Sequence, residues 1–242
     1  MLEAAFWGLV GGIALLAGAL IGLAWRVPRR VIGLVMAFGA GVLISALSFE
    51  LTEEAVRTGG FDATAAGLAA GSLVFFLGDR ALDRMGGADR KRSSGPGPDA
   101  AALGIVLGAV LDGIPESAAI GVSMIDGGGV SVAVVVAVFL SNVPESLSAA
   151  TGLRERMSGA QIIALWSVVA VVSAISAALG YSLLGDASGN WVAFIQSFAA
   201  GAILTMLADT MIPEAFDAEG RSPFTGVVTT LGFALAALLS TL

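Results

Sequence analysis

Apolar residues run along this chain in stretches of about 20, long enough for an α-helix to cross the roughly 30 Å hydrocarbon core of a bilayer. Gly, Pro and charged residues separate these stretches. The pattern predicts an all-α, polytopic membrane protein with one transmembrane domain over residues 1–242. Its eight spans are expected near 4–25, 31–51, 62–82, 100–124, 130–152, 159–184, 190–212 and 223–242, with a linker over 85–99.

Composition supports the membrane assignment. Hydrophobic residues make up 57% of the chain and charged residues 13%, which is more apolar surface than a soluble domain of this length can bury. The lipid bilayer is therefore an expected partner. Nucleic acid is not, because the sequence has no basic stripe and its only lysine is Lys91. The high usage of Ala, Gly and Arg over Lys is typical of a multi-pass protein of a bacterial inner (cell) membrane.

Basic residues predict how the spans are oriented. All of the 12 Lys and Arg residues except Arg57 follow the first, third, fifth or seventh span. Connections rich in basic residues face the cytoplasm, so both termini are expected on the extracytoplasmic side. Termini on one side require an even number of spans, which agrees with eight.

Two internal repeats indicate a transporter architecture. Residues 38–56 and 198–216 share Phe, Ala, Gly, Leu and Glu in register, and residues 111–117 and 140–146 share Leu, Pro, Glu and Ser. The paired spans run in opposite directions, so both repeats are inverted and the eight spans form a 3+2+3 bundle. This arrangement is typical of transporters whose site lies near the midplane.

Each of the two central spans carries a proline followed by a glutamate. Glu116 follows Pro115, and Glu145 follows Pro144. Each proline leaves a carbonyl one turn earlier without its helical donor, and such a carbonyl needs a partner in hydrocarbon. A charge at the bilayer centre costs roughly 2.5–3.5 kcal/mol. Acids and freed carbonyls at similar depth, with no basic residue in either span, predict an oxygen cage for a cation.

Further oxygen-bearing side chains share the faces of these glutamates at helical spacing. The candidate ligands are Asp112, Glu116, Ser141, Asn142 and Glu145. Cysteine and histidine are both absent, so every candidate donor is an oxygen. An alternative stays open, in which the prolines only kink packed helices and the glutamates are protonated hydrogen-bonding groups.

The segments Asp112-Gly-Ile-Pro-Glu-Ser117 and Ser141-Asn-Val-Pro-Glu-Ser146 resemble the paired His-Asn-x-Pro-Glu-Gly type motifs of the ZIP (Zrt/Irt-like) divalent metal transporters. The Phe-Ala-Ala-Gly stretch of the seventh span and its Ile-Pro-Glu ending resemble the same family. The resemblance implies a binuclear site between the fourth and fifth spans and uptake toward the cytoplasm. It also implies that the chain is not an enzyme and has no cofactor besides the transported ion.

Matched to these motifs, Glu116 and Glu145 fall on the family's glutamate ligands, and Asn142 and Ser141 on polar ligand positions of the fifth span. Asp112 stands where the family has a histidine. Imidazole suits zinc, whereas carboxylate and amide oxygens suit Mg²⁺, Mn²⁺ or Ca²⁺. The missing histidines therefore weaken a zinc assignment and leave Zn, Mn, Fe, Mg and Cd all open as the transported divalent metal.

Acids near the ends of the second and seventh spans are expected to stage ions along the pathway. They are Glu50 toward the outer face, and Asp209 and Glu214 toward the cytoplasm. Simple solvation of acids at helix ends is an equally good interpretation of these residues.

Two rival functions and one assembly question remain from the sequence. A proton-coupled carrier of an organic cation would use Glu116 and Glu145 as proton acceptors. An intramembrane aspartyl protease is a remote alternative, since Phe76-Leu77-Gly78-Asp79 only partly resembles a Gly-x-Gly-Asp motif. The sequence leaves the oligomeric state open, with a homodimer among the candidates.

Overall fold

The computed structural model describes residues 1–82, 84, 98–125, 129–155, 157–182, 184, 187–216 and 222–240, with the backbone alone for 98–106. Within these residues every regular element is a helix, which confirms the predicted all-α fold. Residues 85–97 of the expected linker 85–99 lie outside the described part of the chain.

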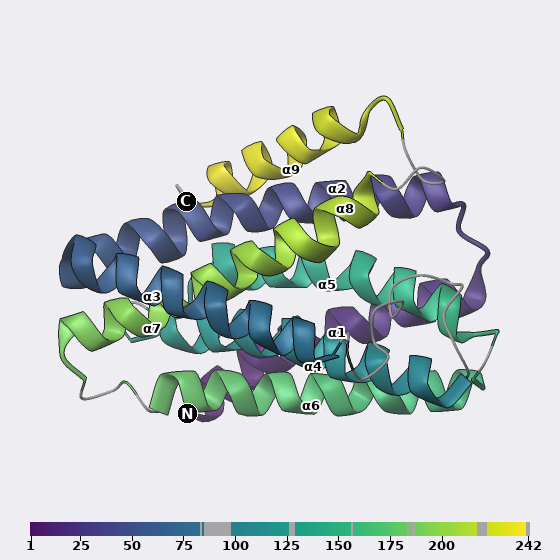
Figure 1. Ribbon diagram of the computed structural model, residues 1–242, viewed down its shortest axis with the longest axis horizontal. Coiled ribbons are helices and arrows are strands. Elements are labelled where there is room, and N and C mark those ends of the chain that lie inside the picture. Colours follow the sequence, from purple (N-terminus) through teal and green to yellow (C-terminus); the bar gives the residue numbers. More distant parts are fainter. Residues whose placement is uncertain are drawn as a thin grey trace.

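The helices follow the predicted apolar stretches closely, within a few residues at most ends (Figure 1). The long helices are α1 (Leu2–Ala24), α2 (Arg29–Ala46), α3 (Glu53–Leu82), α4 (Pro98–Val122), α5 (Val132–Leu153), α6 (Gly159–Ser182), α7 (Gly189–Met206) and α9 (Thr225–Leu239). Long apolar runs specify helices locally because a helix satisfies its own backbone groups without water.

In the described part of the chain, π-helical segments follow α2 and α7, and they were not predicted from the sequence. They are η1 (Leu47–Thr52), after α2, and η3 (Leu207–Met211), after α7 and before the short α8 (Ile212–Ala215). A π turn holds one extra residue, and such turns are frequent at functional sites. Pro213 in α8 cannot donate a hydrogen bond to the carbonyl four residues earlier. That missing bond gives a physical reason for the wide turn in η3.

The second predicted span ends too early. The sequence placed its end near residue 51, whereas helical structure continues through η1 into α3 until Gly60. Arg57 supports this extra length, since it forms an ion pair of 2.5 Å with Glu53 one turn before it. Gly60 has φ 78° and ψ 177°, a conformation that favours glycine. The chain therefore reverses direction at Gly60.

Five described helical segments are long and apolar enough to cross a membrane. They are Leu2–Ala24, Arg29–Leu82, Val132–Leu153, Gly159–Ser182 and Gly189–Ala215. The second covers 54 residues and contains the reversal at Gly60. Helix α9 is apolar but shorter. The chain is therefore a multi-pass membrane protein.

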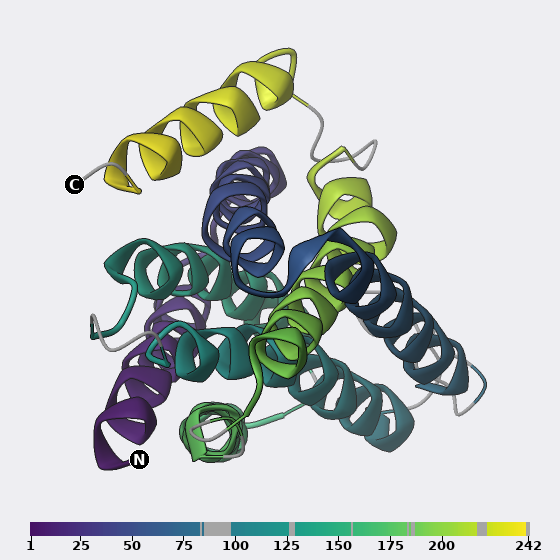
Figure 2. The ribbon, with the colours of Figure 1, turned by 90° about the vertical axis from the view of Figure 1, so that its left-hand side faces the viewer.

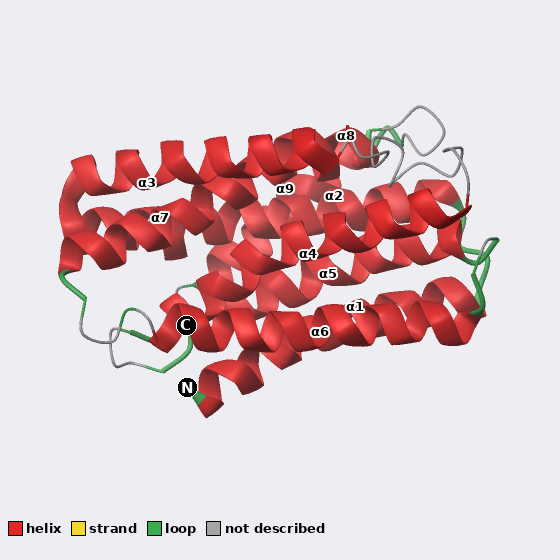
Figure 3. Ribbon diagram, turned by 60° about the horizontal axis from the view of Figure 1, so that its bottom comes forward, coloured by secondary structure: helices red, strands yellow, loops and turns green. Residues whose placement is uncertain are grey.

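The helices pack in two groups that meet along α4 and α5 (Figure 2). In one group α1 packs on α5 and α6, and α4 packs on α6, around an apolar cluster that includes the fully buried Trp166. In the other group α3 packs on α7, and α2 packs on α9. The long helices run roughly side by side (Figure 3), and the beginning of α1 and the end of α9 lie toward the end of the bundle where α2 passes into α3 (Figure 1).

Glycines let the helices of the second group approach within backbone contact. A methyl group on any of these glycines would overlap a carbonyl oxygen of the facing helix. The contacts pair Gly41 with Thr229, Gly232 with Phe38, Gly201 with Leu68, and Gly71 with Phe198. Membrane helices associate through this kind of close packing, because lipid supplies no hydrophobic force between them.

We expect Gly201→Ala to lower the thermal stability of the purified protein, because the added methyl must push α3 away from α7. Overpacking of this kind costs roughly 1–3 kcal/mol. Gly226→Ala in α9 is the matched control, because a Cβ there meets nothing within 4 Å. Thermal unfolding in detergent compares the two variants. An equal unfolding temperature for both would show that the close approach at Gly201 is not needed.

Candidate functional site

Two carboxylates of α4, one turn apart, are buried in the apolar interior of the bundle. Asp112 and Glu116 both have an exposed fraction of 0%. They flank Pro115, which lies inside the helix. Buried ionisable groups in a membrane protein are costly and mark functional sites. The one-turn spacing predicted for these side chains is confirmed, since helical structure is unbroken from residue 98 to residue 122.

A contact joins the α4 carboxylates to α5. The Ser141 Oγ lies 3.4 Å from Glu116 Oε1, and Ser141 is itself 1% exposed. The same hydroxyl donates to the Val138 carbonyl at 3.0 Å. The hydroxyl therefore lies between the Val138 carbonyl and the Glu116 carboxylate, with both within hydrogen-bonding reach. The structure thus brings together two residues that the sequence placed in one site.

Asn142 has a second role that its position in the sequence did not indicate. Its Nδ2 donates a hydrogen bond of 3.0 Å to the Gly11 carbonyl of α1. Asn142 is buried, so this bond satisfies a polar group inside the bundle and fixes α5 against α1. The amide nitrogen is committed to packing, and the amide oxygen is the atom that a cation could use.

Glu145 lies on α5 one turn beyond Ser141 and is half-buried. Pro144 beside it is buried within the helix. Within the described residues, no three His, Cys, Asp or Glu side chains come close enough together to hold a metal ion.

The carbonyl of Leu140, which Pro144 deprives of its helical donor, lies close to α2. A Cβ on Gly39 would be 3.3 Å from this oxygen and 3.2 Å from Ser141 Cα. The absence of a side chain at Gly39 therefore lets α2 approach the backbone of α5 beside the candidate ligands. Sequence reasoning did not single out this glycine.

Glu50 of η1 contacts the beginning of α5. Its Oε2 accepts a hydrogen bond of 2.5 Å from the Ser131 hydroxyl. Ser131 also caps α5, because its oxygen accepts from the Val134 N–H at 3.2 Å. The Gln196 side chain of α7 donates to the Glu50 carbonyl at 3.1 Å. The sequence predicted Glu50 as a pathway residue and missed Ser131 and Gln196.

Glu214 makes a similar contact toward the other end of α5, five residues before the helix ends at Leu153. Its Oε1 accepts a hydrogen bond from the Ser148 hydroxyl. Ser131 and Ser148 are about 25 Å apart along the helix at 1.5 Å per residue. Two carboxylates, Glu50 within η1 and Glu214 in α8 after η3, thus bind serines near the two ends of α5. The only sequence signal for Ser148 was its spacing of three residues from Glu145.

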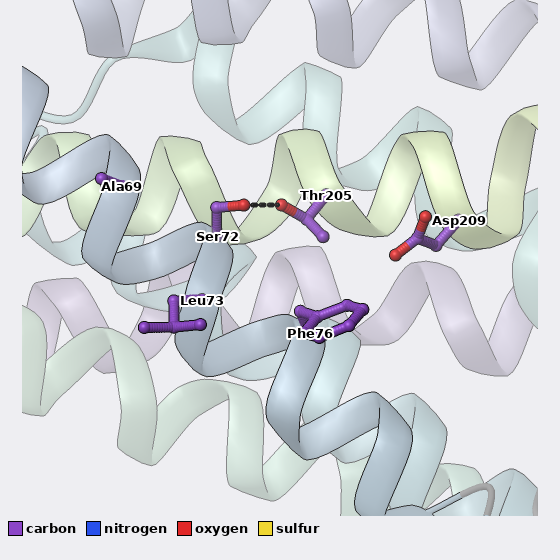
Figure 4. Close-up of a pocket in the computed structure, with 6 residues that line it drawn as sticks. All are labelled: Ala69, Ser72, Leu73, Phe76, Thr205 and Asp209. Carbon is purple, nitrogen blue, oxygen red and sulfur yellow. Dashed lines mark hydrogen bonds between the residues drawn. The ribbon is translucent and has the colours of Figure 1, made fainter.

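Asp209 of η3 lies in a groove of about 530 Å³ between α3 and α7 (Figure 4). The lining residues are Ala69, Ser72, Leu73, Phe76, Thr205 and Asp209. The Thr205 hydroxyl donates to the Ser72 hydroxyl at 2.8 Å. Asp209, expected on the ion pathway, is therefore exposed beside α3 side chains, whereas Glu50 and Glu214 contact α5.

Comparison with known proteins gives one informative relative. No family model matches the chain. Over 213 residues, 87% of its length, the chain is 29% identical to an Arabidopsis thaliana protein described as "Putative zinc transporter At3g08650". The chain spans about a third (34%) of that relative's own length. The relative's description agrees with the resemblance of the motifs to metal transporters.

We expect Asn142→Asp to destabilise the packing of α1 on α5, because a carboxylate oxygen would replace the donor that faces the Gly11 carbonyl. Loss of a buried hydrogen bond partner costs roughly 1–3 kcal/mol. Asn190→Asp is the matched control, because Asn190 is exposed in the first turn of α7, where a negative charge is favourable. Thermal unfolding without added metal measures both, and an unchanged Asn142→Asp variant would contradict the packing role.

Proposed function

We propose that this chain, whose similarity to a zinc transporter supports its assignment to the ZIP-type family, carries divalent metal cations across a membrane. The relative's description is that of a transporter and not of an enzyme. The observation on which the proposal rests is the complete burial of Asp112 and Glu116 in one helix of a multi-pass membrane protein, in contact with Ser141 of the next.

The membrane architecture we propose has eight spans and both termini outside the cytoplasm. Eight long helices among the described residues support this number, with the second and third spans separated by the reversal at Gly60 inside α3. Helix α4, which carries the two buried acids, is the fourth span. Residues 1–242 form a single transporter domain in this proposal.

Matched contacts support the inverted repeat. Gly41 of α2 meets α9 as Gly201 of α7 meets α3, and Gly232 of α9 meets α2 as Gly71 of α3 meets α7. The two π-helical segments begin at Leu47 and Leu207, positions that the sequence repeat aligns with each other. Both similarities follow if the first and last three spans share one design.

The transported ion would bind between α4 and α5. We propose Asp112, Glu116, Ser141, Asn142 and Glu145 as its ligands. Carboxylates supply the charge that offsets a divalent cation, and the hydroxyl and amide oxygens complete an all-oxygen shell. The buried position excludes water, so binding exchanges the hydration shell of the ion for these oxygens.

The proposed path runs along α5 toward the cytoplasm, in the cell membrane. Glu50 stands at its outer end and Glu214 at its inner end, each beside a serine of α5. Asp209 is not included, because it lines the groove between α3 and α7. The relative's description favours a metal substrate over the organic cation that the sequence left open.

We expect Glu116→Gln and Glu145→Gln to reduce divalent cation uptake severely while the protein still folds. Glutamine keeps the size and hydrogen bonding of the side chain but removes its charge. Loss of one charge-assisted ligand contact, at about 1.5–3 kcal/mol, corresponds to about a 10- to 150-fold loss of affinity. Uptake into proteoliposomes measures the effect, with Glu53→Gln, an exposed acid of α3, as control. Parental uptake by both site variants would refute the proposed ligands.

Asp112→His should raise the uptake of zinc relative to manganese or magnesium. The substitution restores a nitrogen donor at the position where the family motif has histidine, and imidazole suits zinc better than the harder ions. Competition uptake with paired ions at fixed pH measures the ratio in the parent and the variant. An unchanged ratio in a variant that still transports would show that Asp112 does not coordinate the ion.

A further inference from the structure

The groove between α3 and α7 combines a charged side chain with exposed apolar neighbours. The Asp209 side chain is exposed, and within the described residues it has no hydrogen bond or ion pair. Leu73, which lines the groove, and Leu77 and Leu204 on the same two helices are more than half exposed. A carboxylate facing lipid is costly unless something outside the chain donates to it. A ligand with hydrogen-bond donors would therefore satisfy the carboxylate in this groove.

The contact between α2 and α9 shows how this groove arises. When Gly41 is aligned with Gly201, Phe49 aligns with Asp209. When Thr229 is aligned with Leu68, Phe233 aligns with Ser72. The rings of Phe49 and Phe233 pack with centroids 5.9 Å apart. This aromatic pair closes the α2–α9 contact. In the α3–α7 contact two short polar side chains take its place, and the space is open (Figure 4).

A positive charge packs against the aromatic residue that lines the groove. The Arg80 guanidinium carbon is 4.9 Å from the centroid of the Phe76 ring, and Phe76 lines the groove with Asp209. Phe76 is six residues before the end of α3 at Leu82, about 9 Å along the helix. A guanidinium and a carboxylate therefore both lie near Phe76, within two helical turns of the end of a span and close to the lipid headgroup region.

We propose that this groove binds the headgroup of a phospholipid with a primary ammonium group, of the phosphatidylethanolamine class. The ammonium would donate to the Asp209 carboxylate and to the hydroxyl oxygens of Ser72 and Thr205, and the phosphate would face Arg80. Leu73 and Leu77 would then contact the acyl chains. A choline headgroup fits less well, because its quaternary nitrogen has no N–H to donate. A bare metal cation would bring no group for Arg80 and no apolar part for the leucines.

This site requires only that the chain lies in a bilayer, and it is independent of metal transport. Its test is lipid binding to the full-length protein. Native mass spectrometry of protein released from vesicles containing equal amounts of phosphatidylethanolamine and phosphatidylcholine gives the ratio of the two bound lipids. We expect the parent to retain the ethanolamine lipid preferentially.

Asp209→Asn should reduce that ratio about tenfold, a change that corresponds to about 1.4 kcal/mol. Asp209→Glu keeps the carboxylate and should preserve the preference. Asp62→Asn removes an exposed acid near the opposite end of α3 and is the matched control, which should behave like the parent. A parent with no preference, or a preference that Asp209→Asn leaves intact, would overturn the proposal.

A second copy of the chain is the other occupant that the experiment must detect. The chain has no cysteine, so Leu73→Cys introduces a single thiol at the groove. Efficient disulfide crosslinking of this variant to itself in the membrane would show that another copy covers the groove, and would overturn the lipid assignment. An introduced thiol that stays uncrosslinked, together with the ethanolamine preference, would support it.

Discussion

Burial of two carboxylates within one turn of α4 is the constraint on which the rest of this structure depends. Asp112 and Glu116 lie in the interior of an apolar bundle, where water cannot solvate them. Their burial is stable only if neighbouring helices bring polar atoms to the same depth. Ser141 does so from α5, and the position of α5 is in turn fixed by Asn142 against α1 and by serines at its two ends.

The scaffold around this centre is built from small residues. Close glycine contacts between α2 and α9, and between α3 and α7, place backbone against backbone in the half of the bundle that carries none of the proposed ligands. Near the site, Gly39 lets the backbone of α2 approach the backbone of α5 at Leu140 and Ser141. The frequent glycines of the sequence are thus spread over the contacts that hold the polar centre in place.

Much of the fold follows from the sequence, because long apolar runs specify helices without reference to their neighbours. The one-turn spacing of Asp112 and Glu116 follows in the same way. Contacts between helices do not, since they depend on the rotation and axial position of each helix. Ser131, Ser148 and Gln196 were missed for this reason, and the extra helical turns before Gly60 were hidden by polar residues that resemble a loop. The widened turn in η3 had a local signal in Pro213, whereas nothing in the residues of η1 explains its similar geometry.

The attachment of α5 at both ends has a consequence for how this helix can move. The Ser131–Glu50 and Ser148–Glu214 bonds connect α5 to segments of the other helical group. Displacement of α5 along its own axis by even one turn, about 5.4 Å, would stretch both bonds far beyond hydrogen-bonding distance. Small tilts about the middle of the helix would move its two ends in opposite directions and would strain both hydrogen bonds. The helix that carries Ser141 and Glu145 is therefore fixed at two points, and its mobility is limited by the strength of two hydroxyl–carboxylate bonds, one at its beginning and one a turn beyond Glu145.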